Sequence, residues 1–227
     1  MSDYYAELSK KENIKIITLN EPFNYSRFNN IAAGYAAGTQ LLFLNNDIEA
    51  VSENWIQEML MYSQRNDVGA VGAQLRYPDK TLQHCYLITG AGPHKVAIHA
   101  GLGLFEGDYG YLDRIGFVRD VSAVTGACLM VKKDIFDKIG GFDEKLSVAY
   151  NDVDICLKIR NEGYGIIYTP YARLIHYESG TRGRDSKDSN RRRLDAEAEY
   201  IKNKWKDKLI DRYYNANFST DREGMLR

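Results

Sequence analysis

The stretch LFLNND at residues 42–47 decides the expected fold, because an apolar run ends there abruptly in two amides and a carboxylate. The apolar run, residues 41–44, has the composition of a strand that is buried on both faces of a sheet. Side chains that follow such a strand lie at the sheet edge where open α/β sheets bind ligands. This stretch therefore predicts a buried strand with a ligand-facing polar end.

A second informative stretch, NDVDICL at residues 151–157, predicts a helix over residues 152–161 with Asn151 as its cap. It is followed by LIHY at residues 174–177, where a lone histidine, His176, ends an apolar strand. Three groups can therefore meet at one edge of the sheet: Asp152 at a helix start, and Asp47 and His176, which each follow a strand.

The remaining pattern predicts one α/β domain with a mostly parallel sheet and flanking helices. Further strands are expected at residues 14–19, 68–75, 121–131, 166–168 and 172–177, the last two separated by Pro170. Further helices are expected at residues 4–11, 28–37, 133–139 and 191–213 and after a Ser52 cap, and residues 77–120 are expected to form hairpins and loops.

Composition excludes several classes of protein. The formal net charge of −1 gives no electrostatic reason to expect a nucleic acid partner. The 3 cysteines are widely spaced without a CxxC pair, which argues against a zinc or disulfide framework and fits a reducing cytosol. No apolar run approaches the roughly 20 residues of a membrane span, and the first residues lack a signal-peptide pattern.

The polar end of the first stretch has two interpretations. Asn45, Asn46 and Asp47 supply the oxygen ligands that Mg²⁺ or Mn²⁺ takes alongside substrate phosphates. Asn and Asp are also favoured turn residues, and from this stretch alone a plain turn is an equal alternative.

Each of the other candidate residues also has both a functional and a structural interpretation when it is considered alone. Asp152 suits a general base that takes a proton from an acceptor hydroxyl, although helix capping is the simpler interpretation in isolation. Asp154 should face away from Asp152 and is expected to be structural. His176 alone is more typical of a structural histidine, and Arg182 in the polar loop that follows suits phosphate binding or plain solvation.

Taken in series, these stretches resemble the inverting family 2 glycosyltransferases of the GT-A (Rossmann-like) fold, in particular bacterial rhamnosyltransferase-like members. The resemblance runs from residue 14 to residue 218. It rests on FNYS at residues 23–26, NN at 29–30, LNND at 44–47, VTGACL at 124–129, GGFDE at 140–144, NDVDICLK at 151–158, HYESGTRG at 176–183 and YYNAN at 213–217.

The resemblance implies a role for each candidate. Asp47 matches the last acid of the family's DxD metal motif, and His176 matches the histidine that completes the Mg²⁺ or Mn²⁺ site. Asp152 matches the catalytic base. The resemblance also implies four donor-binding positions. Asn45 replaces the first acid of DxD, and Asn46 follows it. Gly126 is expected near the sugar and Arg182 near the diphosphate.

The resemblance also implies a departure. Family members begin with two further strand–helix units that hold the nucleotide base, and only 13 residues precede the first expected strand here. The expectation is a single GT-A-like domain over residues 1–227, amino-terminally truncated, with residues 191–227 as a carboxy-terminal helix and tail.

The implied activity is metal-dependent transfer of a hexose from a nucleotide-diphosphate sugar to a saccharide or lipid-linked hydroxyl, in bacterial surface-polysaccharide synthesis in the cytoplasm. Two alternatives stay open: a non-catalytic fragment that binds a glycan or a partner, and a metal-dependent phosphoesterase. Residues 191–213 form a basic amphipathic pattern that suits either core docking or peripheral contact with the inner face of a membrane. Docking is expected, with Trp205 buried and the lysines facing solvent.

Overall fold

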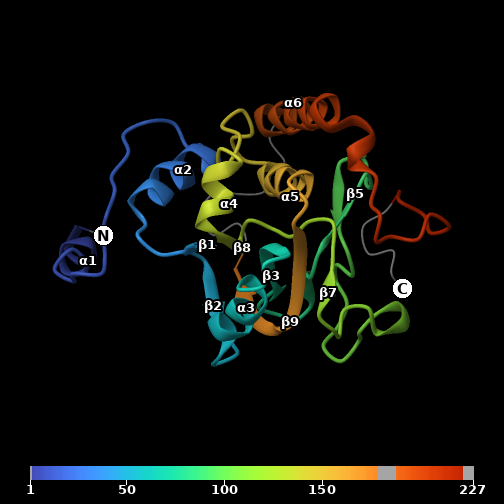
Figure 1. Ribbon diagram of the computed structural model, residues 1–227, viewed down its shortest axis with the longest axis horizontal. Helices are drawn as coiled ribbons and strands as arrows, with labels where there is room; N and C mark the ends of the chain where they lie inside the picture. Colours follow the sequence, from blue (N-terminus) through green and yellow to red (C-terminus); the bar gives the residue numbers. More distant parts are fainter. Residues whose placement is uncertain (1, 178–187, 222–227) are drawn as a thin grey trace.

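The computed structural model describes residues 2–177 and 188–221, and Figure 1 shows a central sheet with helices packed around it. The strands are β1 (Gln40–Leu44), β2 (Ile48–Ala50), β3 (Val68–Arg76), β4 (Leu82–His84), β5 (Leu87–Thr89), β6 (Ala97–His99), β7 (Arg119–Asp120), β8 (Cys128–Lys132) and β9 (Gly165–His176). The helices are α1 (Ser2–Leu8), α2 (Tyr25–Tyr35), α3 (Trp55–Ser63), α4 (Lys133–Lys138), α5 (Asn151–Asn161) and α6 (Asp188–Trp205), with short 3₁₀ turns η1 (Tyr111–Asp113) and η2 (Lys206–Leu209).

The central strands are buried on both faces, as the apolar runs predict. In β1, Leu41 and Phe43 pack into the core beneath α2, α4 and α5, whereas Leu42 packs against the core on the opposite face, beneath α3. The same alternation separates Ala70 from Val71 in β3. Because successive side chains of a strand point to opposite faces, one apolar run supplies both cores.

The main sheet has strand order β1-β8-β3-β9-β2, with β4 added to β3 and β7 added to β9. Among the described strands, the only parallel pair is β3–β9. The expectation of mostly parallel pairing is therefore wrong for the described sheet. The reason is that β8 enters between β1 and β3 in the reverse direction, and the short strands β2, β4 and β7 also run against their neighbours.

Strand β9 is continuous although the sequence predicts a break at Pro170. Its pairing with β3 shifts register there, so that Ala73 faces Thr169 and the next residue, Gln74, faces Arg173. The shift leaves Pro170 outside the ladder, where its missing N–H is not needed. The strand therefore reaches His176 without interruption.

Several predicted boundaries differ from the structure. Residues 14–19 form no strand, because they pair with none of the described strands. The expected strand at residues 121–131 begins only at Cys128, the first residue of β8, and Ala123 before it makes an isolated bridge to Leu87. Ser52 does not cap α3, since its hydroxyl accepts the backbone N–H of Arg173 at 2.9 Å.

Asn151 is the first residue of α5 rather than its cap.

Residues 77–120 form short strands, turns and a separate two-stranded sheet of β5 and β6, as expected. Helix α6 lies over α5, and the chain after it returns alongside β5 (Figure 1). In the described part of the chain, no helix is both long enough and apolar enough to cross a bilayer.

Candidate functional site

Strand pairing brings Asp47 to His176. The β2 strand pairs antiparallel with β9 so that Ile48 faces His176, and the backbone N–H of Tyr177 donates to the carbonyl oxygen of Asp47 at 2.9 Å. The Oδ1 atom of Asp47 then lies 3.1 Å from Nε2 of His176. The two side chains that the sequence singles out as ligands thus meet at one edge of the sheet.

The orientation of His176 is set by Gln83, a residue that the sequence analysis missed. Gln83 Oε1 lies 2.7 Å from His176 Nδ1, and both side chains are buried. An amide oxygen accepts a hydrogen bond, so this contact places a ring proton on Nδ1 and directs Nε2 toward Asp47. No local pattern marks Gln83, because its role depends on the pairing of β4 with β3.

A backbone hydrogen bond holds the turn after β1 against the residue that precedes β8, the neighbouring strand. The backbone N–H of Asn45 donates to the carbonyl oxygen of Ala127 at 2.9 Å. The Asn45 amide nitrogen lies 3.3 Å from His176 Nε2, so Asn45 contacts the histidine directly. The turn interpretation and the site interpretation of residues 45–47 are therefore compatible.

Asp152 is held at the start of α5 by backbone donors. Its Oδ1 accepts the N–H of Val153 at 2.8 Å, and its Oδ2 accepts the N–H of Gly126 at 3.2 Å. Burial raises the pKa of Asp152 above its ordinary value, against the opposing effect of these hydrogen bonds and of His99. A carboxylate with a raised pKa is a better general base near neutral pH.

Gly126 fits between the base and Tyr25. The Tyr25 hydroxyl donates to the carbonyl oxygen of Gly126 at 2.7 Å. A Cβ atom at position 126 would lie 3.0 Å from that hydroxyl and 3.6 Å from the Cβ of Asp152. Glycine therefore keeps the backbone close to both groups. Tyr25 belongs to a stretch that carries the family resemblance, but the sequence alone did not assign it to the site.

The candidate residues open into one cleft of about 650 Å³. It is lined by Phe23, Tyr25, Asn29, Leu44, Asn45, Asn46, Asp47, Thr125, Gly126, Ala127, Val148, Asn151, Asp152 and His176. Every sequence-predicted site residue lies on this cleft except Arg182, which falls outside the described residues. The volume is within the range of small-molecule sites.

The chemistry of Asp47 and His176 fits a divalent cation. With its proton on Nδ1, His176 presents a lone pair on Nε2 toward the acceptor oxygen of Asp47, and two such acceptors need a cation or a proton between them. Among the described residues, no group of three or more His, Cys, Asp or Glu side chains converges as a metal cage. Mg²⁺ in phosphate-transfer sites needs only one or two protein ligands beside substrate oxygens and water.

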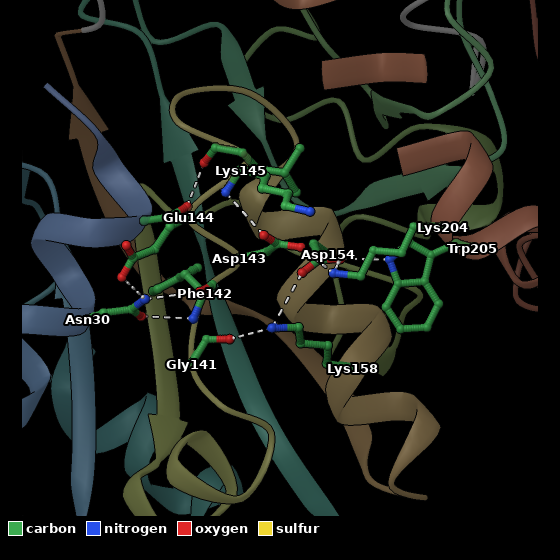
Figure 2. A network of polar contacts seen from close by, with 12 residues as sticks. Asn30, Gly141, Phe142, Asp143, Glu144, Lys145, Asp154, Lys158, Lys204 and Trp205 are labelled. Carbon is green, nitrogen blue, oxygen red and sulfur yellow. Dashed lines mark hydrogen bonds and ion pairs between the residues drawn. The ribbon is translucent and has the colours of Figure 1, made fainter. Parts of the chain in front are cut away.

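Helix α5 is anchored from behind by α6, as Figure 2 shows. The Oδ1 atom of the fully buried Asp154 lies 2.7 Å from both Nζ of Lys204 and Nε1 of Trp205. Lys204 also contacts Asp143 at 2.6 Å. Burial alone would raise the pKa of Asp143, yet hydrogen bonds from Lys204 and Tyr200 bring it down to about 2.

This network refines the expectations for the basic helix. Trp205 is half-buried against the core, as expected for a docked helix. Lys206 and Lys208 are exposed, as expected. Lys204 differs, because its ammonium group is engaged by two carboxylates of the domain (Figure 2). Asp154 is structural, as the sequence indicates.

Glu197 of α6 holds the wall of the cleft, and the sequence analysis missed it. Its carboxylate accepts the backbone N–H of Ser147 at 2.8 Å, of Val148 at 3.3 Å and of Ala149 at 2.7 Å. The Ser147 hydroxyl adds a fourth bond at 2.7 Å. Because Val148 lines the cleft and α5 follows directly, Glu197 fixes the approach to Asp152.

Comparison with known proteins gives the same family as the sequence motifs. Residues 1–140 match the family model described as glycosyl transferase family 2. The chain is 40% identical over 216 residues to the uncharacterised protein y4gI of Sinorhizobium fredii, an alignment that covers 94% of this chain and 23% of that protein. It is 38% identical over 174 residues to the O-antigen biosynthesis protein RfbC of Myxococcus xanthus, covering 75% of this chain and 13% of that protein.

A shorter match of 34% identity over 67 residues, 30% of this chain and 22% of the other, is with the N-acetylglucosaminyl-diphospho-decaprenol L-rhamnosyltransferase of Mycobacterium tuberculosis. The chain thus spans less than a quarter of the length of these relatives.

Solved structures confirm the GT-A fold. The chain superposes with a TM-score of 0.65 on GalNAc-T7, solved with UDP, GalNAc and Mn²⁺, at 14% identity over 92% of this chain and 40% of that one. It superposes with a TM-score of 0.52 on the mannosyltransferase PcManGT from Pyrobaculum calidifontis, solved with GDP-Man and Mn²⁺, at 15% identity over 79% of this chain and 44% of that one.

Proposed function

The chain belongs to glycosyl transferase family 2, and from this premise we propose that its cleft carries out inverting transfer of a hexose from a nucleotide-diphosphate sugar to a saccharide or lipid-linked hydroxyl. The observation that carries the proposal is the convergence of Asp47, His176, Gly126 and Asp152 on one cleft. In the proposed site, Asp47 and His176 form a cation-binding end, Asp152 forms a proton-accepting end, and the Gly126 backbone lies close to Asp152.

The cation-binding end is proposed to receive the donor diphosphate. Asp47 and His176 would hold Mg²⁺ or Mn²⁺, and the ion, when bound, offsets the negative charge that develops on the leaving diphosphate. The Mn²⁺ in the complexes of the two solved glycosyltransferases supports this choice of ion. Asn45 and Asn46 are proposed to contact the donor from the same turn, and Arg182 to contact its diphosphate.

The other end is proposed to activate the acceptor. The Asp152 carboxylate takes the proton of the acceptor hydroxyl as the new glycosidic bond forms. The backbone N–H groups of Gly126 and Val153 fix the orientation of the carboxylate and leave it further lone pairs to accept that proton. Its raised pKa increases its strength as a base.

The proposed setting is the synthesis of a bacterial surface polysaccharide in the cytoplasm, on a saccharide or lipid-linked acceptor. The named relatives RfbC and the rhamnosyltransferase support this setting. The phosphoesterase alternative would need more metal ligands than Asp47 and His176, and the described residues hold no group of three or more His, Cys, Asp or Glu side chains that could supply them.

The test is release of nucleoside diphosphate by the purified chain from a panel of UDP-, GDP- and TDP-sugars with Mn²⁺ and octyl glycosides as acceptors. The expected result is glycoside-stimulated release that requires both Asp47 and Asp152. Absence of release, together with intact folding and glycoside binding, would favour the non-catalytic alternative.

A further inference from the structure

The peptide segment 125–127 lines the cleft and lies outside every described helix and strand. No regular ladder fixes its backbone, so its N–H groups depend on individual acceptors. The Thr125 N–H donates to Nε2 of His84 at 3.1 Å, and the Gly126 N–H donates to Oδ2 of Asp152 at 3.2 Å. Consecutive residues of one short segment thus bind a buried histidine and the proposed base.

His84 provides a fixed and neutral acceptor. It belongs to β4, which pairs with β3, and its side chain is fully buried. Burial lowers the pKa of the His84 ring well below its ordinary value, so the ring stays neutral near neutral pH and Nε2 keeps a lone pair for Thr125. An ionised ring would carry a proton on both nitrogens and could not accept this bond.

His99 sets the tautomer of His84. With Nε2 as an acceptor, the proton of the neutral His84 ring must lie on Nδ1. That atom lies 2.9 Å from Nδ1 of His99, which accepts the proton, and the two rings meet edge to face with their centroids 5.0 Å apart. The hydrogen bond at one ring nitrogen decides which nitrogen is free, so His99 keeps Nε2 of His84 available to Thr125.

We infer that His84 is a positioning residue for Asp152 and acts through the peptide segment 125–127. The inference rests on the proposed function, since it takes Asp152 as the base. Because His84 holds the Thr125 N–H, the next peptide is set so that the Gly126 N–H meets the carboxylate. His84 itself does not line the cleft, so its effect on the rate comes from the orientation of the base.

The test changes the acceptor and approximately preserves the size of the side chain. His84→Met offers no comparable acceptor, whereas the glutamine oxygen in His84→Gln can accept the Thr125 N–H from about the position of Nε2. Both variants lose the contact with His99, so the comparison isolates the acceptor. His84→Met is expected to lower kcat about 10- to 100-fold with donor KM unchanged, and His84→Gln to restore most of the rate.

Ile88→Ala is the matched control for lost stability. Ile88 is a buried core residue of the nearby strand β5 and does not line the cleft. The melting temperature of Ile88→Ala should fall while kcat stays at the wild-type value. Equal losses of kcat in Ile88→Ala and His84→Met at matched loss of stability, or equal losses in His84→Met and His84→Gln, would overturn the inference.

The titration of Asp152 separates the inference from the proposed function, because ¹³C NMR of its carboxyl group needs no turnover. The Gly126 N–H lowers the pKa of Asp152, so a weaker bond in His84→Met should move the titration to higher pH, whereas His84→Gln should match the wild type. His99 also acts on this pKa, but its contact with His84 is lost in both variants.

Both results of the titration are decisive. A role of His84 in stability alone would leave the titration of Asp152 unchanged in His84→Met, and that result would overturn the inference. The shift to higher pH in a chain without turnover would overturn the proposed function and support the positioning role.

The wild-type chain gives a test that needs no variant. At neutral pH, ¹⁵N NMR should show His84 with a bare Nε2 and a protonated Nδ1, as its contacts with Thr125 and His99 require. A protonated Nε2 would overturn the inference, because the ring could then not accept the Thr125 N–H.

Discussion

The Nδ1 atom of His176 lies 2.7 Å from the Oε1 atom of Gln83, and this contact directs Nε2 of the ring toward Asp47. Outer partners of this kind fix the tautomer and orientation of a metal-ligating histidine. The pair therefore makes the proposed cation site depend on a residue that would not itself touch the ion.

Gln83→Leu is expected to weaken Mn²⁺ binding in the presence of nucleoside diphosphate by about 10- to 100-fold, because the ring loses the acceptor that orients it. Asp47→Ala removes a ligand and should weaken binding at least as much. Titration calorimetry measures both, with the exposed Glu53→Ala as a control that should bind as wild type. Equal affinity in wild type and Asp47→Ala would contradict the site.

Asp152→Asn is expected to lower kcat about 10²- to 10⁴-fold, the usual contribution of a general base, while donor affinity is unchanged. The asparagine oxygen can accept only one of the two backbone N–H groups, of Val153 and of Gly126, that donate to the two oxygens of Asp152. Initial rates and donor titration give both quantities. A parallel loss of donor affinity, or a melting temperature several degrees lower, would indicate a capping role instead.

The rate should fall as the pH drops through the pKa of Asp152, because a protonated carboxyl cannot accept the acceptor proton. Burial raises this pKa above 3.8, so the acid limb of the kcat/KM profile should lie above that pH. The Thr125 hydroxyl lowers the pKa through a hydrogen bond, and Thr125→Val should move the limb to higher pH. A shift to lower pH would contradict the assignment.

The raised pKa of Asp152 also makes the free energy of unfolding depend on pH in a definite direction. A folded-state pKa above the unfolded value means that protonation favours the folded state, and this contribution is lost as the pH rises through the folded pKa. Asp152→Asn cannot titrate here, so the variant should lose less of its free energy of unfolding than the wild type as the pH rises from 5 to 7. Denaturant titrations at both pH values measure the two slopes, and a steeper loss in the variant would refute the argument.

Lys204→Met is expected to lower the free energy of unfolding by about 3 kcal/mol, because it removes a partner from the fully buried Asp154. The matched control is Lys202→Met on the same helix, whose ion pair with Glu199 lies at the surface and should change stability by no more than about 0.5 kcal/mol. Urea denaturation compares the two. Equal effects would show that the network in Figure 2 does not anchor α6.

Binding of the chain to anionic vesicles is expected to be weak and to disappear at moderate salt. Trp205 packs against the core and donates to Asp154, so the exposed charges of Lys206 and Lys208 are left to act through screened surface attraction. Vesicle co-sedimentation at 0.02 and 0.3 M salt, about 20 and 6 Å of screening length, provides the test. Salt-resistant binding that Trp205→Ala abolishes would make α6 a membrane anchor.

Several features were predictable because they depend on neighbours in the chain. The apolar run at residues 41–44 predicts a strand buried on both faces, and β1 contributes to both cores. The acid at the start of α5 and the histidine at the end of β9 lie where their local patterns place them. The break predicted at Pro170 was wrong, because a register shift removes that residue from the ladder without ending the strand.

The sequence by itself determined the family, the buried strands and which polar side chains end them, since periodicity and motif order are properties of short stretches. Only the tertiary structure decided that the reversed strand β2 sets Asp47 beside His176, that Gln83 orients the ring and that Glu197 holds the wall before Asp152. These contacts join residues 129, 93 and 50 positions apart. Such pairings arise from the packing of whole elements, which no local pattern of residues encodes.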